Sequence, residues 1–313
     1  MSTIHDIAKI TGYSVSTISR VLNNHPYVSD EKRARVKAVI KDLDYIPNSN
    51  ARSLSYGKSL QIGVLLPLIN NSWFDEMTSG VIEEASKKGY TVTILPTNYE
   101  AELEDKYLTG ALAKAYDGLI ILSRKSSLEK IAEYAEKVAI VCCEEIGDYP
   151  ISAVYMERQQ LYQKIFLELK EANQLPIGIT LSRDELASPS MKQTLEAFTV
   201  VFGDLEQAVI YRECRSFEEG LEAGQFFKNH EAQPKAIFTN GDEVAAGIVT
   251  SYDSSERPII IGQGNQLLSQ VLNFSSVAHP LKEIGRAAFK ELFTEGHHQI
   301  ELTSQLIKRE ALN

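Results

Sequence analysis

Several features of membrane and secreted proteins are missing from this chain. In its 313 residues no apolar run approaches the roughly 20 residues that a bilayer-spanning helix needs. The first residues also lack the charged and then apolar pattern of a signal peptide. We therefore expect a cytoplasmic protein without a membrane partner.

Cysteine is scarce as well. Cys142 and Cys143 are adjacent within an apolar run, and Cys214 is isolated. This spacing contains neither a disulfide framework nor a set of metal ligands. We expect the three thiols to be small buried side chains in a reducing compartment, and we expect no bound metal.

The motifs of common α/β enzymes are also missing. The chain has no Gly-x-Gly-x-x-Gly after its first strand-like run, no Gly-x-x-x-x-Gly-Lys-Ser/Thr loop and no Gly-x-Ser-x-Gly elbow. His230 and His279 have no acidic or Cys neighbour at ligand spacing. We therefore expect neither an enzyme nor a bound cofactor.

Basic residues are the minority, with 32 Lys and Arg against 42 Asp and Glu for a net charge of −10. Because a nucleic-acid surface must neutralise phosphates, this total argues against a nucleic-acid partner. The distribution is uneven, however. Residues 1–58 hold nine basic and five acidic side chains, a net charge of +4, which leaves −14 for the remainder. This asymmetry predicts a basic module attached to an acidic body.

The basic module has the spacing of three short helices. Thr3 and Asp6 form the polar pair of a helix start, and apolar residues recur at helical spacing until Gly12. Ser14 can begin a second helix, and Ser29 can begin a third. Two helices across a glycine turn followed by a third describe a helix-turn-helix, although any small three-helix bundle would show the same periodicity.

The outward face of the second helix helps to choose between these interpretations. It is small and hydroxylic with one Arg, and consists of Ser16, Thr17, Ser19 and Arg20. Such a face can approach the floor of a DNA groove closely, and Arg can bind guanine with two hydrogen bonds. Four basic residues of the third helix are available for phosphates: Lys32, Arg33, Arg35 and Lys37. The chemistry favours a DNA-reading helix.

A short polar segment separates the module from the body. Pro47 blocks continuation of the third helix, and residues 48–57 are rich in Ser and Asn. Composition alone predicts a flexible linker. Leu54 is an apolar side chain that a polar tether does not explain.

From residue 60 onward, apolar runs of strand length alternate with helical stretches. In the first series we expect strands at 62–66, 91–95, 118–122 and 139–142, with helices at 74–88, 102–116 and 129–136. A second series of strands begins at 177–181, 208–211, 236–239 and 259–262. Continuous apolar strands covered by helices predict parallel, doubly wound α/β sheets. Two series predict two lobes with a cleft between them.

The motifs of the module carry a family resemblance. They are residues 3–8 (Thr-Ile-His-Asp-Ile-Ala), 14–23 (Ser-Val-Ser-Thr-Ile-Ser-Arg-Val-Leu-Asn), 45–48 (Tyr-Ile-Pro-Asn) and 51–54 (Ala-Arg-Ser-Leu). In this order they resemble the lactose-repressor/galactose-repressor (LacI/GalR) family of bacterial transcription regulators. Weaker matches at 117–120, 242–247, 280–285 and 309–310 resemble that family's body, which looks like a periplasmic sugar-binding protein.

The resemblance implies how DNA is read. In that family the second helix lies in the major groove, so Val15, Ser16 and Arg20 would face base edges. The linker would fold as a hinge helix on operator DNA and pair with the hinge of a dimer partner, with Ala51 packed in the minor groove and Leu54 as an apolar wedge. The implied DNA-binding residues are Thr3, Ser14, Val15, Ser16, Thr17, Ser19, Arg20, Asn23, Asn48, Ala51, Arg52 and Leu54.

The resemblance also implies an effector between the lobes, where the parallel strands end. The candidates after the first strand are Asn70, Asn71, Trp73 and Phe74. Amides bind sugar hydroxyls and aromatic rings stack on sugars, although the two aromatic residues could equally be core. Arg124 and Asp242 are further candidates, each of which could instead be a solvated charge or a helix cap.

Two positions depart from the sugar-binding pattern of that family. Thr194 stands where the resemblance places an Arg, and residues 262–264 read Gly-Gln-Gly where Gly-Phe-Asp is common. Lys192 or Gln263 would then substitute for the missing groups. This departure favours a phosphorylated sugar or a non-sugar ligand, and weak or absent effector binding is the remaining alternative.

These inferences combine into one hypothesis: a homodimeric repressor of carbohydrate-related genes that binds a palindromic operator and is modulated by a sugar or sugar phosphate. The predicted domains are a helix-turn-helix domain at 1–46, a hinge at 47–59, and an effector-binding and dimerisation domain at 60–313. Its lobes are predicted at about 60–157 plus 280–300, and about 158–279 plus 301–313. The alternatives are a cytosolic sugar-binding protein or α/β enzyme without a DNA role, and corepression by a phosphorylated carrier protein.

Overall fold

The structure is a computed structural model that describes residues 3–23, 25–45, 57–183 and 188–309. The chain divides into two compact units, residues 1–59 and residues 60–313. Four residues expected in the hinge lie outside the described residues: Asn48, Ala51, Arg52 and Leu54. Within the described ranges, none of the helices is long and apolar enough to cross a membrane.

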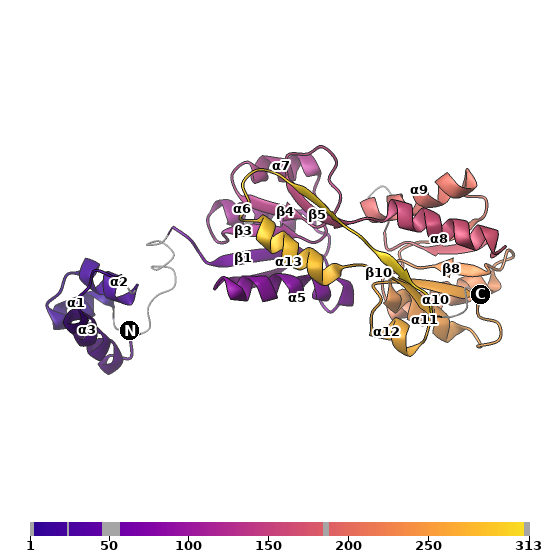
Figure 1. Ribbon diagram of the computed structural model, residues 1–313. Coiled ribbons are helices and arrows are strands. Elements are labelled where there is room, and N and C mark those ends of the chain that lie inside the picture. The colour runs from indigo at the N-terminus through magenta and orange to yellow at the C-terminus, as the bar shows by residue number, and fades with distance from the viewer. Residues whose placement is uncertain (1–2, 24, 46–56, 184–187, 310–313) are drawn as a thin grey trace. The chain divides into compact units, whose positions relative to one another are not determined.

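The amino-terminal unit consists of three helices, α1 (Ile4–Thr11), α2 (Val15–Leu22) and α3 (Asp30–Asp42) (Figure 1). Thr3 and Asp6 form a reciprocal capping box at the start of α1, and Gly12 ends that helix in the left-handed region at a φ of 74°. The Ser14 hydroxyl caps α2. The buried core consists of Ile7, Ile18, Val21 and Val36. The expected caps at Thr3 and Ser14 and the stop at Gly12 are confirmed, whereas Ser29 precedes α3 without a side-chain cap hydrogen bond.

The first lobe of the second unit is a sheet in the order β11-β5-β4-β3-β1-β2, with every neighbouring pair parallel. Its strands are β1 (Gln61–Leu66), β2 (Thr91–Pro96), β3 (Gly118–Ile121), β4 (Ala139–Cys142), β5 (Ser152–Met156) and β11 (Gln299–Leu302). Its helices are α5 (Ser72–Lys87), α6 (Ala101–Leu112), α7 (Leu128–Ala135) and α13 (Leu281–Glu291).

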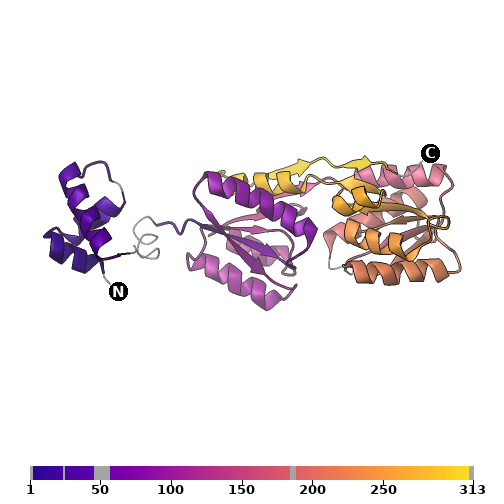
Figure 2. The same cartoon turned by 90° about the horizontal axis from the view of Figure 1, so that it is seen from below.

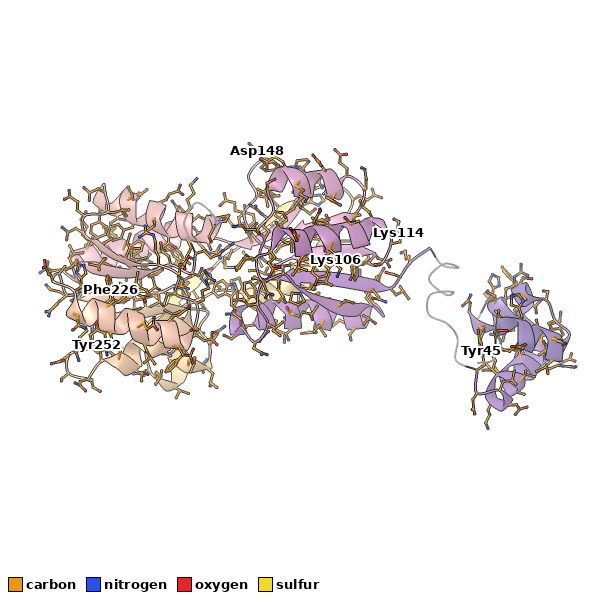
Figure 3. All side chains as sticks on the ribbon, turned by 180° about the vertical axis from the view of Figure 1, so that it is seen from behind. Tyr45, Lys106, Lys114, Asp148, Phe226 and Tyr252 are labelled. Atoms are coloured by element: carbon orange, nitrogen blue, oxygen red, sulfur yellow. The ribbon has the colours of Figure 1, made fainter. Side chains whose placement is uncertain are left out.

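The second lobe is a sheet in the order β12-β10-β9-β8-β6-β7. Its strands are β6 (Ile177–Thr180), β7 (Ala208–Tyr211), β8 (Ala236–Phe238), β9 (Ile259–Gln263), β10 (Ser275–Ala278) and β12 (Gln305–Ile307). Its helices are α8 (Gln159–Glu171), α9 (Pro189–Phe202), α10 (Phe217–Asn229), α11 (Asp242–Ser251) and α12 (Leu267–Val271). All pairs are parallel except the antiparallel pair of β10 and β12. Phe226 on α10 and Tyr252 after α11 mark one side of this lobe (Figure 3).

The two lobes repeat one strand order. In each lobe the second strand lies beside the first at one edge, and the later strands continue on the other side of the first. The chain changes lobe between β5 and α8, between β10 and α13, and between β11 and β12 (Figures 1 and 2). Because β11 reaches Leu302 in the first sheet, the predicted change of lobe after residue 300 comes two residues early. The doubly wound, two-lobed architecture is confirmed.

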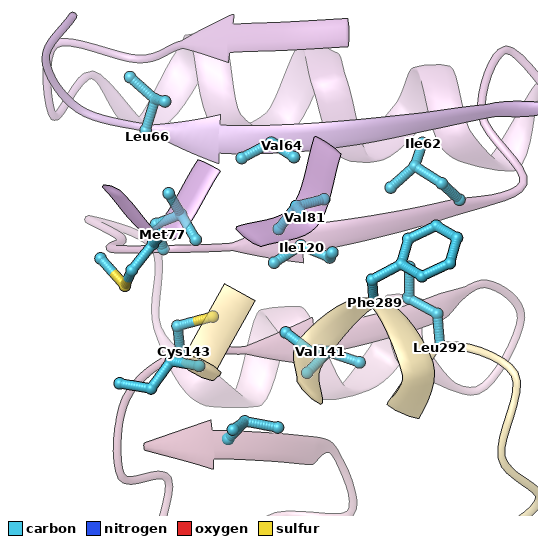
Figure 4. Close-up of a cluster of buried hydrophobic side chains, with 14 of the residues drawn as sticks. Ile62, Val64, Leu66, Met77, Val81, Ile120, Val141, Cys143, Phe289 and Leu292 are labelled. Carbon is cyan, nitrogen blue, oxygen red and sulfur yellow. The ribbon is translucent and has the colours of Figure 1, made fainter. Parts of the chain in front are cut away.

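The core of the first lobe depends on two closely packed helices. Ile62, Val64 and Leu66 of β1 point towards the face that α5 and α13 cover (Figure 4). At Gly285 of α13, a Cβ atom would lie 1.9 Å from the carbonyl oxygen of Met77 on α5. The close approach of these helices therefore requires a residue without a side chain at this position.

Candidate functional site

The α2 helix of the amino-terminal unit presents the residues that were expected to read DNA. Its first turn is held by the Ser14 hydroxyl, which accepts from the Thr17 backbone N–H at 3.2 Å and lies 2.8 Å from the Ser16 hydroxyl. Ser16 and Arg20 are exposed, whereas Val15 and Thr17 are half-buried. Fewer side chains are therefore accessible to a DNA groove than the four expected on the outward face of α2. Ser16 and Arg20 are the most accessible of them.

Other expected DNA contacts shape the ends of these helices. The Thr3 backbone N–H and the Thr3 hydroxyl each donate to the Asp6 carboxylate at 2.8 Å. Both hydrogen bonds lower the pKa of that exposed carboxyl group. At the other end of α2, the Asn23 side chain donates to the Ser19 hydroxyl at 3.5 Å. These side chains fix helix ends, and their contact with DNA stays a prediction.

The basic side chains of α3 gather beside the turn between α1 and α2. Lys32 and Arg35 lie over the Tyr13 ring, at 5.8 Å and 5.9 Å from its centroid. The Arg33 guanidinium donates to the carbonyl oxygen of His25 at 3.0 Å. Lys32, Arg35 and Lys37 are exposed, so their charges are available to phosphates.

The body contains a second candidate site, a cleft at the carboxyl ends of both sheets. The segments that line it follow β1 to β5 in the first lobe and β6 to β9 in the second. The cleft contains about 1170 Å³ of empty space, part of it continuous with solvent. In each sheet the strand order reverses beside the first strand of that lobe, which is where doubly wound sheets bind ligands.

The segment after β1 forms part of the first-lobe wall. Asn71 lines the cleft and also caps α5, since its side-chain oxygen accepts from the Phe74 N–H at 3.4 Å. Ser72 donates across to Gln266 of the second lobe at 2.7 Å. The Trp73 ring contacts the core and packs edge-on against His279 at 5.1 Å between centroids. Trp73 and Phe74 line the cleft and also pack on the core, and their contact with a ligand stays a prediction.

Asp242 occupies the second-lobe wall at the start of α11. Its buried carboxylate accepts from the Ser276 hydroxyl at 2.6 Å and from the Gln266 N–H at 2.7 Å. Burial raises the pKa of this carboxyl, against the opposing effect of these donors. A Cβ atom on Gly262 would lie 2.2 Å from the Asp242 carboxylate, so that glycine is required beside it.

Gln263 lines the cleft and also belongs to a buried network of hydrogen bonds. Its side chain accepts from the Tyr162 hydroxyl at 2.6 Å and donates to the Thr239 carbonyl at 2.7 Å. His279 lies 3.3 Å from the Gln263 side-chain oxygen and 2.7 Å from the Ser304 hydroxyl. Burial holds the pKa of His279 well below its usual value, so the ring is neutral. The network joins the cleft to two of the segments that cross between the lobes.

Three expected effector residues do not line the cleft. Asn70 is exposed at a φ of 55°, in the turn before α5. Lys192 is exposed on α9 and pairs with Glu196, because the helix turns Gln193 and Thr194 towards the cleft instead. Arg124 lies behind the wall, where it pairs with Glu144 and donates to the Ser126 carbonyl at 2.7 Å. These assignments are corrected by the direction of the side chains.

Several cleft residues were not found from the sequence. They include Tyr99, Glu144, Arg158, Tyr162 and Arg183. Arg158 follows β5 and Arg183 follows β6, so the rule that ligands bind where parallel strands end was the available signal for both. Tyr162 lies on a helix, and an apolar helical pattern gives no sign of a cleft position.

Buried polar atoms without a hydrogen-bond partner in the described part of the chain gather around this cleft. They include Arg183 Nε, the Gln193 side-chain oxygen and the Gln266 side-chain nitrogen. An unsatisfied buried polar group is costly, and a polar ligand or water can satisfy it. The cleft is therefore equipped to bind a ligand with many hydrogen-bonding groups.

The described residues offer little for metal or covalent chemistry. No group of three or more His, Cys, Asp or Glu side chains among them could hold a metal ion. Cys143 lines the cleft, but burial raises the pKa of its thiol and so disfavours the thiolate. The arrangement of the cleft is suited to binding.

Two family models match this chain. The model described as "Bacterial regulatory proteins, lacI family" matches residues 3–48. The model described as "Periplasmic binding proteins and sugar binding domain of LacI family" matches residues 59–289. Together they cover both candidate sites.

Curated relatives match over nearly the whole chain. Catabolite control protein B of Bacillus subtilis is 37% identical over 310 residues, which cover 99% of this chain and 100% of that protein. A ribose operon repressor of Halalkalibacterium halodurans is 46% identical over 332 residues, which cover 99% of this chain and 97% of that protein. Both matches therefore extend over nearly the full length of each protein.

Solved structures show the same fold. The Lac repressor dimer bound to operator and the anti-inducer ONPF has a TM-score of 0.81 at 20% identity, covering 99% of this chain and 98% of that chain. The transcriptional regulator CelR in complex with cellobiose has a TM-score of 0.69 at 17% identity, covering 99% of each chain. At these identities the likeness concerns the fold alone.

Proposed function

Because the chain belongs to the LacI family of bacterial regulatory proteins, we propose that it is a transcription repressor that reads an operator with α2 and responds to a small molecule in the cleft. The genes that it controls concern carbohydrate use, as the names of the ribose operon repressor and catabolite control protein B suggest. The site of action is the bacterial chromosome, and so the cytoplasm.

The observation that carries the DNA role is the exposed pair of Ser16 and Arg20 on a capped helix. The two side chains are four residues apart, so they lie on the same face of α2. Arg20 can bind guanine with two hydrogen bonds, and Ser16 can donate or accept. Lys32, Arg35 and Lys37 supply positive charge for the phosphates.

A single helix-turn-helix reads only half of an operator. Two copies related by a two-fold axis read a palindrome, and we therefore propose a homodimer. In this proposal Asn48, Ala51, Arg52 and Leu54 belong to a hinge that binds the minor groove, with Leu54 wedged at the centre of the operator. The coupling of hinge formation to the cleft provides the route by which a ligand changes DNA affinity.

We propose that the effector is a sugar or sugar phosphate. The support is a cleft that combines the rings of Trp73 and Tyr99 with the polar side chains of Asn71, Asp242 and Gln266. Aromatic faces pack against the apolar side of a sugar ring, while amides and carboxylates bind its hydroxyls. The cleft therefore has both kinds of groups that such a ligand requires.

The test is selection of binding sites from a random DNA duplex library with the full-length protein. We expect enrichment of a two-fold symmetric sequence that binds at least a hundredfold more tightly than a scrambled duplex at the same salt concentration. Equal affinity for both duplexes would refute the DNA role. Adding sugars and sugar phosphates to the selected complex then identifies ligands that change its affinity.

A further inference from the structure

Three guanidinium groups lie near one carboxylate at the first-lobe wall of the cleft. Arg124 forms an ion pair with Glu144, and both side chains are nearly buried, at 15% and 13% exposure. Arg158 and Arg183 are also close enough to favour the charged form of Glu144 against its burial. Since one carboxylate balances one of these cations, the group has an excess of positive charge.

Arg183 reaches across the cleft from the second lobe. Its guanidinium lies 4.0 Å from the centroid of the Tyr99 ring and donates to the Arg124 carbonyl at 3.3 Å and to the Ser123 hydroxyl at 3.4 Å. The partners of these contacts are neutral, and the Nε–H has no acceptor in the described part of the chain. Among the described residues, these contacts hold the charge of Arg183 in place and none of them neutralises it.

Arg158 approaches the same region from the crossing between β5 and α8. It lines the cleft beside Tyr162, and its charge favours the neutral form of the nearby His279 ring. Within the described ranges, neither Arg158 nor Arg183 has a carboxylate within ion-pair distance. Two cations that have no counter-ion among the described residues therefore border one cavity.

The other carboxylates that line the cleft do not pair with Arg158 or Arg183, because they bind other groups or lie elsewhere on the wall. Asp242 accepts from Ser276 and from the Gln266 N–H on the second-lobe wall. Glu145 accepts from the Gln193 amide. Burial raises the pKa of Glu243, and the nearby carboxylates of Asp75 and Glu218 raise it further. Asp242 and Glu243 therefore make the side of α11 acidic, whereas Glu145 lies after β4 on the first-lobe wall and accepts from Gln193 of α9.

We propose that the effector carries an oxyanion group, a phosphate ester or a carboxylate, which binds to Arg158 and Arg183 in the cleft. The inference rests on the proposed function of the cleft as an effector site. Guanidinium groups bind such oxygens through paired charge-assisted hydrogen bonds. The hydroxyl-bearing end of the ligand then faces Asp242 and Asn71, whose side-chain oxygens can accept hydrogen bonds from hydroxyl groups.

This subsite also connects ligand binding to the closure of the cleft. Arg183 belongs to the second lobe but contacts Ser123 and Arg124 of the first. An oxyanion bound to it and to Arg158 reinforces the bridge between the lobes. A neutral sugar lacks this group, so we expect the anionic ligand to bind more tightly than its neutral parent.

The test measures binding by titration calorimetry with matched probes: ribose against ribose 5-phosphate, glucose against glucose 6-phosphate and gluconate, and inorganic phosphate alone. At least one anionic probe should bind tenfold or more tightly than its neutral parent. Arg158→Gln and Arg183→Gln should each lower that affinity tenfold or more, while neutral-sugar affinity changes less than threefold. Arg183→Lys keeps the charge and should retain part of the affinity.

Arg212→Gln is the matched control, because Arg212 is exposed and does not line the cleft. Equal affinity for anionic and neutral probes, unchanged affinity in both cleft variants, or no anionic probe that binds would each overturn the proposal. The operator affinity of the same ligand-free samples is measured separately. Failure of operator binding refutes the DNA role, whereas failure of the anionic probes with intact operator binding refutes only the subsite.

Discussion

The helix-turn-helix unit and the two-lobed body assemble their functional surfaces differently. In the unit, Ser16 and Arg20 share one helix, and the Ser14 cap that starts it is two residues away. In the cleft, Tyr99, Glu144 and Arg183 come from loops after three different strands and from both lobes. A local surface tolerates changes elsewhere in the chain, whereas a surface assembled from distant segments depends on the packing of both lobes.

The hydrophobic cores of the two regions differ in size. Four buried residues form the centre of the amino-terminal unit: Ile7, Ile18, Val21 and Val36. The body has four separate buried clusters, on both faces of its two sheets. We therefore expect the body to be the more stable region, with its own unfolding transition. The single Trp of the chain, Trp73, lies in the body, so its fluorescence reports on that transition alone.

The largest effect is expected for Gly285→Ala. The new Cβ atom would overlap the Met77 carbonyl of α5, so the two helices must separate, and the body should lose about 3 kcal/mol of unfolding free energy. Urea unfolding followed by Trp73 fluorescence measures the loss. The control is Gly110→Ala on α6, where the nearest atom to a Cβ lies at 3.6 Å, and the body should gain about 0.5 to 1 kcal/mol.

Equal stabilities of these two glycine variants would contradict the close packing of α5 and α13. The same samples also test the comparison between the amino-terminal unit and the body. The amino-terminal unit has its own core, but the proposed operator-binding dimer is held by the body. The DNA affinity of Gly285→Ala at low temperature should therefore follow the fraction of body that remains folded.

Arg20→Ala tests the local surface. Loss of a two-bond guanine contact should cost about 2 kcal/mol of specific binding, roughly a thirtyfold loss of affinity, while Trp73 unfolding stays unchanged. Fluorescence anisotropy with the selected operator and with duplexes altered at each guanine measures it. Arg20→Lys keeps the charge and should retain the salt dependence but lose base preference. If operator preference survives in both variants, Arg20 is not a base reader.

Glu104→Gln tests a buried link in the cleft wall. The Glu104 carboxylate accepts from the N–H groups of Lys125 and Ser126 at 2.6 Å and 2.7 Å, and so it holds the loop that carries Arg124. An amide has only one acceptor oxygen, so the body should lose about 2 kcal/mol in Trp73-monitored unfolding. Glu102→Gln, exposed on the same helix, should have no measurable effect. Similar values for the two variants would remove this role of Glu104.

The smallest effect concerns pH and His279. Burial keeps this ring neutral in the folded protein, while an unfolded His has a pKa of about 6.5. Below that pH the unfolded state binds a proton that the folded state does not, so the body loses up to about 1.4 kcal/mol per pH unit. His279→Gln should reduce this slope between pH 6.5 and 5, and His297→Gln at an exposed position should not. Parallel slopes for all three proteins would contradict the prediction.

Periodicity predicted most elements closely. The helix expected at 74–88 is found at Ser72–Lys87, and the strand expected at 62–66 is found at Gln61–Leu66. Hydroxyl caps and Gly12 located the helix ends of the amino-terminal unit, because these signals act over a few residues. The strand β11 was not expected, since its pairing partner β5 lies more than 140 residues away in the chain.

The cleft was predicted only in part. Asn71, Trp73 and Asp242 were found because they follow strands, and strand ends meet at one edge of a parallel sheet. Arg124 was assigned to the wrong surface, because its pairing with Glu144 depends on how β3 and β4 lie side by side. Arg158 and Arg183 carry no motif, and their common cavity exists only once the two lobes are folded together.

The sequence by itself determined the helix-turn-helix, the alternation of strands and helices and the split of charge between a basic unit and an acidic body. Each of these features depends on residues that are close together in the sequence. Only the tertiary structure decided which charges are paired. Glu144 neutralises Arg124 and leaves Arg158 and Arg183 facing an open cleft. The physical reason is that an ion pair depends on a few ångströms of distance between side chains, and that distance is set by the packing of segments far apart in the chain.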